Sequence, residues 1–482
     1  MNRRMVIYTL GILLDIEAVL MLLPAAVSFM FGELRTGAML VVASGAAAMV
    51  GTLGLFLCRK HDRTIYAKEG FVIVSLAWLA MTLFGALPFV FAGELGFVDA
   101  IFEIASGFTT TGASIITDLD KISRGLMFWR SFTHWIGGMG VLVLMMAILP
   151  SDTDGSVHIL KAEMPGPTFG KLVPKLRKTA MILYLIYIGI SATEAILLMC
   201  GGLNLYEALI YTFGTAGTGG FGLKGDSLTT YTPYVQWVIA IFMMLFGVNF
   251  NLYYLALMGK VKSAVKSREL WLYLSIIAVS ICIVGFHIRT LYTNFGDTVR
   301  TSTFQVASIV TTTGYSTADF DSWNGVAKGM LFLLYFVGGC AGSTAGGIKI
   351  SRLILLGKTI RRDLRHMVHP HSVGVVKFEG KRVSDQTLNG VTSFFLLYCA
   401  ILAGVFLLLS VFEPSVNVET NLTATMATLN NVGPGFGKVG PYLSYAFYSP
   451  FSKLALTLSM LFGRLEIYPL ILILSPNTWK RR

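Results

Sequence analysis

The sequence predicts an all-α integral membrane protein in which an N-terminal two-helix hairpin precedes four pseudo-symmetric repeats. Of its 482 residues, 54% are hydrophobic and 13% are charged, whereas soluble proteins average about 25% charged residues. Apolar windows of about 20 residues, enough to cross a hydrocarbon core of about 30 Å, recur from end to end. A short glycine-containing motif also recurs four times, which indicates a duplicated membrane module. No soluble domain of ordinary size is left over.

The expected spans follow from the apolar windows and the loops between them. The N-terminal apolar run is too long for a signal peptide and lacks a small-residue cleavage site, so we expect a retained first helix. The spans are a hairpin at 5–31 and 36–58, then pairs at 70–92/124–149, 178–202/232–258, 268–287/324–357 and 388–412/446–475. These ten crossings divide the chain into the hairpin (1–68) and repeats 1 to 4 (69–150, 151–262, 263–382 and 383–482).

The basic residues set the expected topology. The formal net charge is +12, and Lys and Arg cluster in alternate loops, as they do in cytoplasmic loops of membrane proteins. The clusters are CRKHDR (58–63), KLVPKLRK (171–178), KVKSAVKSR (260–268), KTIRRDLRHMVHPH (358–371) and KRR (480–482). We therefore expect both chain ends to be cytoplasmic, and this uneven distribution does not favour nucleic acid as a partner.

The opposite loops carry carboxylates. TDLDK (117–121), Asp226 and TADFDSW (317–323) lie in the predicted outer loops. These groups either concentrate cations at the outer face or are merely solvated. The five cysteines are scattered through mostly apolar segments without metal or CxxC spacing, and we interpret them as core residues.

A half-length apolar segment lies inside each of the four later pairs. Each has about a dozen residues, too few to span a membrane, and each precedes a glycine-rich turn. The segments are GFVDAIFEIASGF, LNLYEALIYTFGTA, DTVRTSTFQVASIV and VETNLTATMATL. We interpret them as re-entrant helices, because irregular backbone at membrane depth is tolerated only inside protein or beside a water-filled cavity.

The turns after these segments align at one glycine. They are TTTGAS (109–114), AGTGGFG (216–222), TTTGYS (311–316) and NNVGPGFG (430–437), and the aligned glycines, about a hundred residues apart, are Gly112, Gly219, Gly314 and Gly433. Glycine lets carbonyl oxygens turn towards a common axis. A ring of such oxygens can replace the hydration shell of an alkali cation, as in potassium channel filters.

Helix ends and hydroxyl groups strengthen this interpretation. The C-terminal end of each short helix carries about half a negative charge, so four ends aimed at one point favour a monovalent cation. Threonine hydroxyls add oxygen ligands without net charge. The candidate cation ligands are Thr110, Thr111, Gly112, Thr218, Gly219, Thr312, Thr313, Gly314, Asn431, Val432 and Gly433.

These turns, together with GGCAGSTAGGIK (338–349), resemble the Trk/Ktr/HKT superfamily of potassium transporters over essentially the whole chain. The additional N-terminal hairpin resembles the TrkH branch. The resemblance implies four non-identical helix–pore loop–helix repeats around one pore, with K⁺ as the transported ion and no organic cofactor bound by this chain. Plant relatives that favour sodium tend to carry Ser at the first filter position, so Gly112 favours potassium.

The stretch VGGCAGSTAGGIK interrupts the second predicted helix of repeat 3. It holds five glycines within 338–347, and each costs up to about 1 kcal/mol relative to Ala in a helix. We expect a break about 20 Å below the outer end, at 1.5 Å per residue. The resemblance implies an intramembrane gating loop formed by Gly338, Gly339, Gly342, Ser343, Thr344, Gly346 and Gly347.

Two other interpretations of this stretch remain open. Small residues also form helix-packing faces in membranes. An intramembrane serine hydrolase built on Ser343 would need a His–Asp partner set, and none lies nearby in the sequence.

Arg464 in LFGRLEIYPL is the clearest ionisable residue inside a predicted span. Glu466 sits about 200° away around the helix, whereas Lys453 falls on the same face and suggests a basic stripe. The resemblance places Arg464 near the gate and pore, where its charge opposes cation passage. We expect its guanidinium to donate hydrogen bonds to carbonyls of the gating loop. The alternative is an interhelical ion pair with Glu194 or Glu103.

The predicted function is potassium uptake across the bacterial cytoplasmic (inner) membrane, without enzymatic activity. The chain has no Walker or GxGxxG fingerprint, so nucleotide control would lie in a partner. The resemblance implies a homodimer and a cytosolic TrkA-like ring of nucleotide-binding regulatory subunits. Loops 171–178 and 358–382 are candidate docking surfaces, and the lipid bilayer surrounds the helices.

The main alternative is a proton- or sodium-coupled potassium symporter. Its proton relay would use Lys453, Arg464 or Glu194. We interpret His134 as a core histidine rather than a relay, and we assign Asp15 and Glu17 in the first hairpin to packing or to lipid-facing pairing.

Overall fold

The computed structural model describes residues 1–59, 67–140, 176–372 and 374–479. Within them the chain is helical apart from one small antiparallel hairpin, β1 (Lys377–Phe378) and β2 (Lys381–Arg382). The predicted all-α class is confirmed, and six helices are long and apolar enough to cross a membrane. The chain is therefore a multi-pass membrane protein. The predicted stretches 60–63, 141–149, 171–175 and 480–482 lie outside the described residues.

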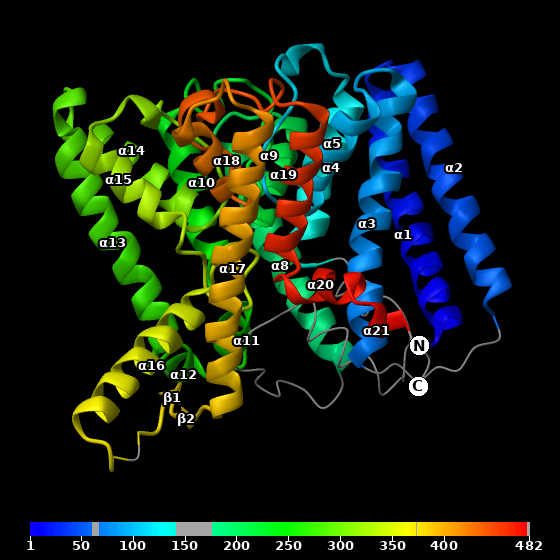
Figure 1. The fold of residues 1–482 in the computed structure, drawn as a ribbon. Coiled ribbons are helices and arrows are strands. Elements are labelled where there is room, and N and C mark those ends of the chain that lie inside the picture. The colour runs from blue at the N-terminus through cyan, green and yellow to red at the C-terminus, as the bar shows by residue number, and fades with distance from the viewer. Residues whose placement is uncertain (60–66, 141–175, 373, 480–482) are drawn as a thin grey trace.

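The N-terminal hairpin consists of α1 (Arg3–Met30) and α2 (Leu34–Leu57), close to the predicted spans. The Ser44 hydroxyl donates a hydrogen bond of 2.6 Å to the Ala18 carbonyl and joins the two helices. Figure 1 shows α1 and α2 at one edge of the bundle, beside α3.

A long helix, a short helix, an irregular segment and a second helix then follow four times, in the predicted order. The long helices are α3 (Ala67–Ala92), α8 (Leu176–Cys200), α13 (Arg268–Ile288) and α17 (Asp385–Phe412). The short helices are α4 (Phe97–Phe108), α9 (Leu205–Gly217), α14 (Phe295–Val310) and α18 (Val418–Leu429). The second helices are α5 (Arg124–Gly138), α10 (Pro233–Phe246), α15 (Gly325–Leu334) and α19 (Pro450–Arg464). Figure 1 shows the short helices in the half of the bundle away from the start of α1.

The remaining elements are shorter or lie at one end. They are α11 (Phe250–Leu257), α12 (Val261–Val265), α16 (Ile350–Val368), α20 (Tyr468–Leu474), α21 (Pro476–Trp479) and the single-turn helices η1 (Leu119–Lys121), η2 (Arg289–Leu291), η3 (Phe320–Ser322) and η4 (Gly437–Val439). In Figure 1, α12, α16, β1, β2 and α21 lie at the same end of the bundle as the start of α1.

The second helix is interrupted in repeat 3, as the sequence predicts, and also in repeats 2 and 4. The break after α15 was expected, but the continuous spans predicted at 232–258 and 446–475 are wrong. Helices α10 and α11 meet at 89°, because the Asn249 side chain accepts a hydrogen bond of 2.9 Å from the Asn251 N–H and starts a new helix. Counting this bent pair, the described residues contain up to seven candidate spans rather than the predicted ten.

The break after α19 centres on a backbone conformation that is rare for its residue type. Ile467 has φ +70° and ψ −57°, and the Tyr468 N–H donates to the Glu466 carbonyl at 2.7 Å. This is a γ-turn with a β-branched residue at positive φ, which is strained. The Arg352 guanidinium pairs with the Glu466 carboxylate beside it. A helical sequence pattern therefore continues through a point where the chain turns sharply.

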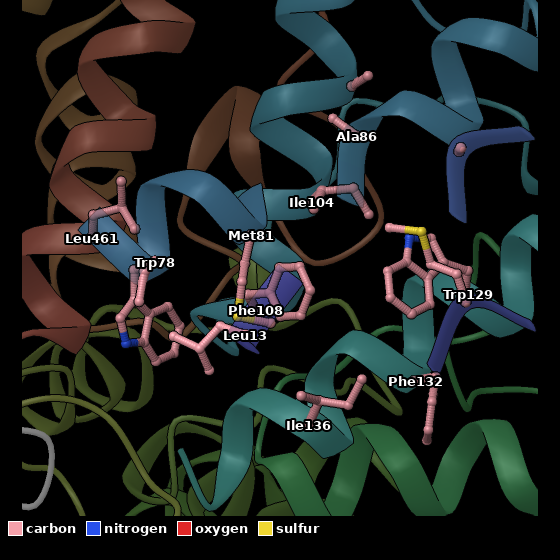
Figure 2. Close-up of a cluster of buried hydrophobic side chains, with 14 of the residues drawn as sticks. Leu13, Trp78, Met81, Ala86, Ile104, Phe108, Trp129, Phe132, Ile136 and Leu461 are labelled. Atoms are coloured by element: carbon pink, nitrogen blue, oxygen red, sulfur yellow. The ribbon is translucent and has the colours of Figure 1, made fainter. Parts of the chain in front are cut away.

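A buried cluster fixes the end of the first short helix. Figure 2 shows Phe108, the last residue of α4, among side chains of α1, α3 and α5. Its ring lies edge-on to Trp129, with ring centroids 6.0 Å apart. The Trp129 indole N–H donates to the Gly85 carbonyl at 2.9 Å. Close packing of large side chains leaves little freedom, so the turn that begins at residue 109 has a defined starting point.

The hairpin also caps α5. Glu33, between α1 and α2, accepts hydrogen bonds from the Arg124 N–H at 2.8 Å and the Gly125 N–H at 3.2 Å. The first N–H groups of a helix have no partner within that helix. A carboxylate at this end also interacts favourably with the helix dipole.

Candidate functional site

The four turns after the short helices share one backbone conformation. Each begins with a non-glycine residue in the left-handed region, namely Thr110 (φ +55°), Thr218 (+55°), Thr312 (+57°) and Asn431 (+55°). In the first turn the Thr110 N–H donates to the Gly107 carbonyl at 3.1 Å, and the Thr111 N–H donates to the Ser106 carbonyl at 2.9 Å. The same two bonds recur in the other three turns. Each short helix thus ends in a Schellman motif.

A glycine with positive φ follows two residues later in every turn. These glycines are Gly112 (φ +81°), Gly220 (+80°), Gly314 (+84°) and Gly433 (+94°). A Cβ at each would collide with a backbone oxygen of the next turn, namely the oxygens of Gly219, Thr313, Val432 and Thr111 in that order. The order passes from turn 1 to 2, 3, 4 and back to 1. The four turns therefore form a closed ring, which we call the glycine ring, and only glycine fits its contacts.

The second turn corrects the sequence alignment by one residue. The alignment placed Gly219 beside the other three glycines, but Gly220 has the positive φ and contacts the next turn. Gly219 instead supplies a ring oxygen, as Thr111 does in the first turn. Two adjacent glycines hid the register. The constant spacing of two residues from the left-handed residue, as in Thr218 to Gly220, would have revealed it.

Side chains of the turns form hydrogen bonds to another turn and to the backbone at Gly346. The Asn431 amide donates to the Thr111 hydroxyl of another turn at 2.9 Å. The Thr312 hydroxyl accepts from the Gly346 N–H at 2.7 Å. These side chains are fully buried, so their hydrogen bonds form out of contact with bulk water.

Two cavities flank the glycine ring. The cavity on the side of the predicted outer loops, which we call the outer cavity, has a volume of about 240 Å³ and is lined by the four ring glycines together with residues of those loops. Its described lining residues include Arg130, Lys224 and, from the predicted acidic loop 117–121, Thr117 and Leu119, but no carboxylate. The inner cavity measures about 60 Å³ and is lined by Gly342, Gly346, Arg464 and neighbouring residues.

The Gly-rich segment, residues 338–349, separates the ring from the inner end of the molecule. It docks into the break between α10 and α11: the Cys340 N–H donates to the Gly247 carbonyl at 2.9 Å, and the Phe250 N–H donates to the Gly342 carbonyl at 3.0 Å. The Thr344 hydroxyl donates to the Phe246 carbonyl at 3.2 Å. The segment is therefore held by separate bonds to different elements.

Arg464, the last residue of α19, reaches three parts of the site. It donates to the Thr344 carbonyl of the Gly-rich segment at 2.9 Å and to the Thr110 hydroxyl at 3.3 Å. It also donates to the carbonyls of Gly137 and Gly138 at 2.5 and 2.7 Å. The expected bond to the segment is thus present in the structure. Five N–H donors in a planar fork allow one side chain to serve several acceptors.

The alternative ion pair of Arg464 with Glu103 and the basic stripe are not supported. Glu103 pairs with Arg130 at 2.5 Å, and both side chains are almost fully buried. Lys453 pairs with Asp99 at 2.7 Å near the opposite end of α19, so its charge is balanced locally.

Comparison with known proteins places these features in a family. Residues 39–481 match the TrkH family model, described as a cation transport protein. The Trk system potassium uptake protein TrkH of Escherichia coli strain K12 is 32% identical over 100% of both chains. The TrkH protein of Halomonas elongata is 34% identical, also over 100% of both chains. The crystal structure of the potassium transporter TrkH from Vibrio parahaemolyticus superposes with a TM-score of 0.90 at 31% identity, covering all of both chains.

This chain belongs to the TrkH family. The predicted resemblance is therefore confirmed, and so is the all-α membrane fold. In this TrkH-family chain the residues that hold the turns were mostly missed from the sequence. Glu103 accepts hydrogen bonds from the Ser114 hydroxyl at 2.9 Å and the Ile115 N–H at 2.8 Å, just beyond the first turn. Its partner Arg130 also stacks 3.4 Å from the Phe221 ring. An arginine inside apolar α5 was the available signal.

His134 joins two turns of this TrkH-family chain. One ring nitrogen lies 2.7 Å from the Gly107 carbonyl, and the other accepts from the Phe221 N–H at 3.3 Å. Both nitrogens are engaged with backbone groups, which agrees with the interpretation of a core histidine.

Proposed function

We propose that this chain carries K⁺ into the cell through the glycine ring. The observation that carries the proposal is the closed contact order of the four turns, in which each ring glycine faces a backbone oxygen of the next turn. Four carbonyl-bearing turns in a ring are the arrangement that replaces the hydration shell of an alkali cation. The relatives described above are named as potassium uptake proteins.

The helices behind the ring favour a monovalent cation electrostatically. The turns follow the C-terminal ends of α4, α9, α14 and α18, and each helix end carries about half a negative charge. The proposed ligands are the eleven residues named from the sequence, with Gly220 added because it occupies the ring position in the second turn. Neutral oxygens suit K⁺, which needs coordination without tight binding.

The Gly-rich segment and Arg464 serve as the gate in this proposal. Gly346 and Arg464 bond the hydroxyls of Thr312 and Thr110, which belong to two of the four turns. A cation leaving the ring inwards meets this segment and the positive charge of Arg464. Displacing the segment opens the path.

We further propose an orientation and an assembly. The basic α12, α16 and the β1–β2 hairpin lie on the side where α1 begins, which the distribution of Lys and Arg predicts to be cytoplasmic. The membrane is the bacterial cytoplasmic membrane, and both chain ends face the cytosol. The functional unit is a homodimer bound by a TrkA-like ring of nucleotide-binding subunits.

No observation favours the two competing functions. Arg464 and Lys453, two of the three residues considered for a proton relay, are engaged with carbonyl groups and with Asp99. The Ser343 hydroxyl donates to the Cys340 carbonyl at 2.7 Å, so it lacks the base that a hydrolase nucleophile needs.

The deciding experiment is ion flux in proteoliposomes that contain the purified full chain. We expect K⁺ flux well above Na⁺ flux, with a reversal potential set by the K⁺ gradient alone. A reversal potential that moves with pH at constant K⁺ would establish proton coupling instead. Equal flux of both cations would refute the potassium-selective ring. Growth of a potassium-uptake-deficient bacterium, with and without a regulatory subunit, tests the same proposal in cells.

A further inference from the structure

The β1–β2 hairpin turns on an unusual residue. Its two turn residues, Glu379 and Gly380, have φ angles of +46° and +78°. Two-residue hairpins of this kind favour Asn, Asp or Gly at the first position, and another residue type in the left-handed region costs about 1 kcal/mol. Phe378 beside the turn is buried, whereas Glu379 is exposed. A glutamate held there at a conformational cost indicates a role for its carboxylate.

That carboxylate caps a transmembrane helix more than a hundred residues earlier. One oxygen of Glu379 accepts from the Ser267 hydroxyl at 3.1 Å, the Arg268 N–H at 2.9 Å and the Glu269 N–H at 3.3 Å. These groups form the start of α13. The hairpin and the first turn of α13 are thus joined by hydrogen bonds to a charged group, which are stronger than neutral ones.

The next residue along this path reaches the Gly-rich segment. Glu269 is 4% exposed, and one of its oxygens accepts from the Ala341 N–H at 2.7 Å and the Ser351 N–H at 3.2 Å. Ala341 lies within the segment, and Ser351 lies in the first turn of α16 directly after it. A single carboxylate oxygen therefore ties the segment to the helix that follows it.

We propose that Glu379 and Glu269 form a hydrogen-bonded relay that couples the cytosolic hairpin to the gate, with Glu269 as a positioning residue for the Gly-rich segment. The inference rests on the proposed function, because it names the route by which the same gate is regulated. Moving the hairpin withdraws the cap from α13 and shifts the residue that holds Ala341. Within the described residues, the segment also bonds to α10, α11, Thr312, Arg464 and the start of α16, where the Ile350 N–H donates to the Gly339 carbonyl at 3.2 Å. Helix α16 contacts the hairpin separately, through the Lys358 ammonium and the Lys377 carbonyl at 2.6 Å, and the Glu379 substitution leaves this second connection in place.

The hairpin is the accessible end of this relay. Lys377, Lys381 and Arg382 are exposed, while Phe378 anchors the hairpin in the protein. A movement of these exposed side chains also moves Glu379, because the two residues of β1 directly precede it in the chain. The segment itself is buried and cannot be contacted directly from the cytosol at Cys340 or Thr344.

A native cysteine next to Ala341 reports the position of the segment. Cys340 is a free, fully buried thiol. The test uses the full chain in membranes with the other cysteines, Cys58, Cys200, Cys282 and Cys399, replaced by serine. The readouts are the rate of maleimide labelling of Cys340 and the basal K⁺ flux of the same preparations. Thermal unfolding of each variant separates a moved segment from a destabilised protein.

The relay predicts an ordered set of results. Glu269→Ala should speed labelling about tenfold, the change expected in an equilibrium when one charge-assisted hydrogen bond is lost. Glu379→Ala should speed it in the same direction, and the double variant should label no faster than Glu269→Ala alone. Gln at either position keeps an acceptor oxygen and should stay near the wild-type rate. Asp385→Ala, which removes an exposed cytosolic ion pair with Arg362 at 2.9 Å, is the matched control and should not change labelling.

Two results would overturn the relay. One is wild-type labelling in Glu379→Ala alongside fast labelling in Glu269→Ala. The other is a double variant whose effect is the product of the two single effects, because independent sites act additively in free energy. If Glu269→Ala fails to insert, Glu379→Ala alone carries the test, and a wild-type labelling rate of Cys340 in that variant overturns the relay. Labelling needs no transport, so absence of potassium flux in the wild type would refute the proposed function and leave this test intact.

Discussion

Two glycine-rich regions lie next to each other in this chain, and glycine serves a different purpose in each. In the glycine ring, every positive-φ glycine faces a backbone oxygen of the next turn. The Gly-rich segment has two glycines with positive φ, Gly342 and Gly347, and neither faces a backbone oxygen of another element. A Cβ on Gly342 would meet the side-chain oxygen of Asn249 at 3.1 Å. A side chain can move aside, whereas a backbone carbonyl held by its own helix cannot.

The difference indicates which region is fixed and which one moves. Displacing one turn of the ring breaks contacts with two neighbouring turns, so the ring resists partial displacement. The segment is held by separate hydrogen bonds to α10, α11, α13, Thr312 and Arg464, and each can be lost alone. Substitutions in the ring should therefore alter selectivity, and substitutions around the segment should alter basal flux.

The largest expected effect comes from the ring. Gly112→Ser places a Cβ against the Gly219 oxygen at a positive φ of +81° and adds a hydroxyl ligand. Strain of about 3 kcal/mol corresponds to about a hundredfold change in an equilibrium constant. We expect the ratio of K⁺ flux to Na⁺ flux to fall by about the same factor. Paired flux measurements in both cations test it. Gly329→Ser, where no atom lies within 4 Å of the added Cβ, is the control. Unchanged selectivity in Gly112→Ser would remove the first turn from the ring.

A substitution pair at Arg464 separates charge from anchoring. Arg464→Gln removes the charge, and Arg464→Lys keeps the charge but loses the planar fork. If anchoring of Thr344 dominates, both variants should raise basal K⁺ flux about thirtyfold, since the bond from the charged donor to the Thr344 carbonyl, worth about 2 kcal/mol, is lost or weakened. If repulsion of the cation dominates, only the glutamine variant should do so. Wild-type flux in both variants would leave Arg464 with a purely structural role.

A single neutral bond to the segment should matter less. Thr344→Val removes the hydroxyl bond to the Phe246 carbonyl at 3.2 Å and keeps the size of the side chain. The loss of one neutral hydrogen bond corresponds to about fivefold in an equilibrium, and basal flux should rise by that factor without a change in ion preference. A change in selectivity instead would contradict the division between fixed ring and moving segment.

The smallest effect concerns the outer cavity. Lys224 lines it, and its ammonium lies 4.5 Å from the centre of the Tyr231 ring. Lys224→Gln should lower the K⁺ concentration for half-maximal uptake about twofold, since one screened charge at about 10 Å is worth a few tenths of a kcal/mol. The maximal rate should not change. The effect should shrink at high ionic strength; an effect that is independent of salt would exclude an electrostatic origin.

The sequence predicted the order of the helices because hydrophobic length leaves few alternatives in a membrane. Apolar windows of spanning length recovered α1, α2, α3, α8, α13 and α17, and half-length windows recovered the four short helices. Two of the turns were visible because they repeat Thr-Thr-Thr-Gly, and the third-repeat break was visible because five glycines are dense in one stretch.

The features that the sequence did not predict depend on backbone conformation, backbone carbonyls or the rotation of one helix against another. None of these leaves a pattern in the sequence. Ile467 adopts a positive φ that its side chain disfavours, so a propensity rule predicts a continuous helix there. Arg464 bonds the carbonyls of Gly137 and Gly138, and every residue has a carbonyl. The pair Glu103 and Arg130 forms between two helices whose relative rotation the sequence does not specify.

The cap that Glu33 places on α5 bears on how the chain is assembled in the membrane. The carboxylate is synthesised about ninety residues before the N–H groups of Arg124 and Gly125 that it accepts, and chains fold from the N-terminus during synthesis. Helix α5 therefore inserts beside an acceptor that is already in place. A chain shortened to begin after residue 66 would lose both bonds to the Glu33 carboxylate at the exposed start of α5, and hydrogen bonds to a charged group are worth about 1.5–3 kcal/mol each. The hairpin thus supplies a partner for the first turn of α5 before that helix is made.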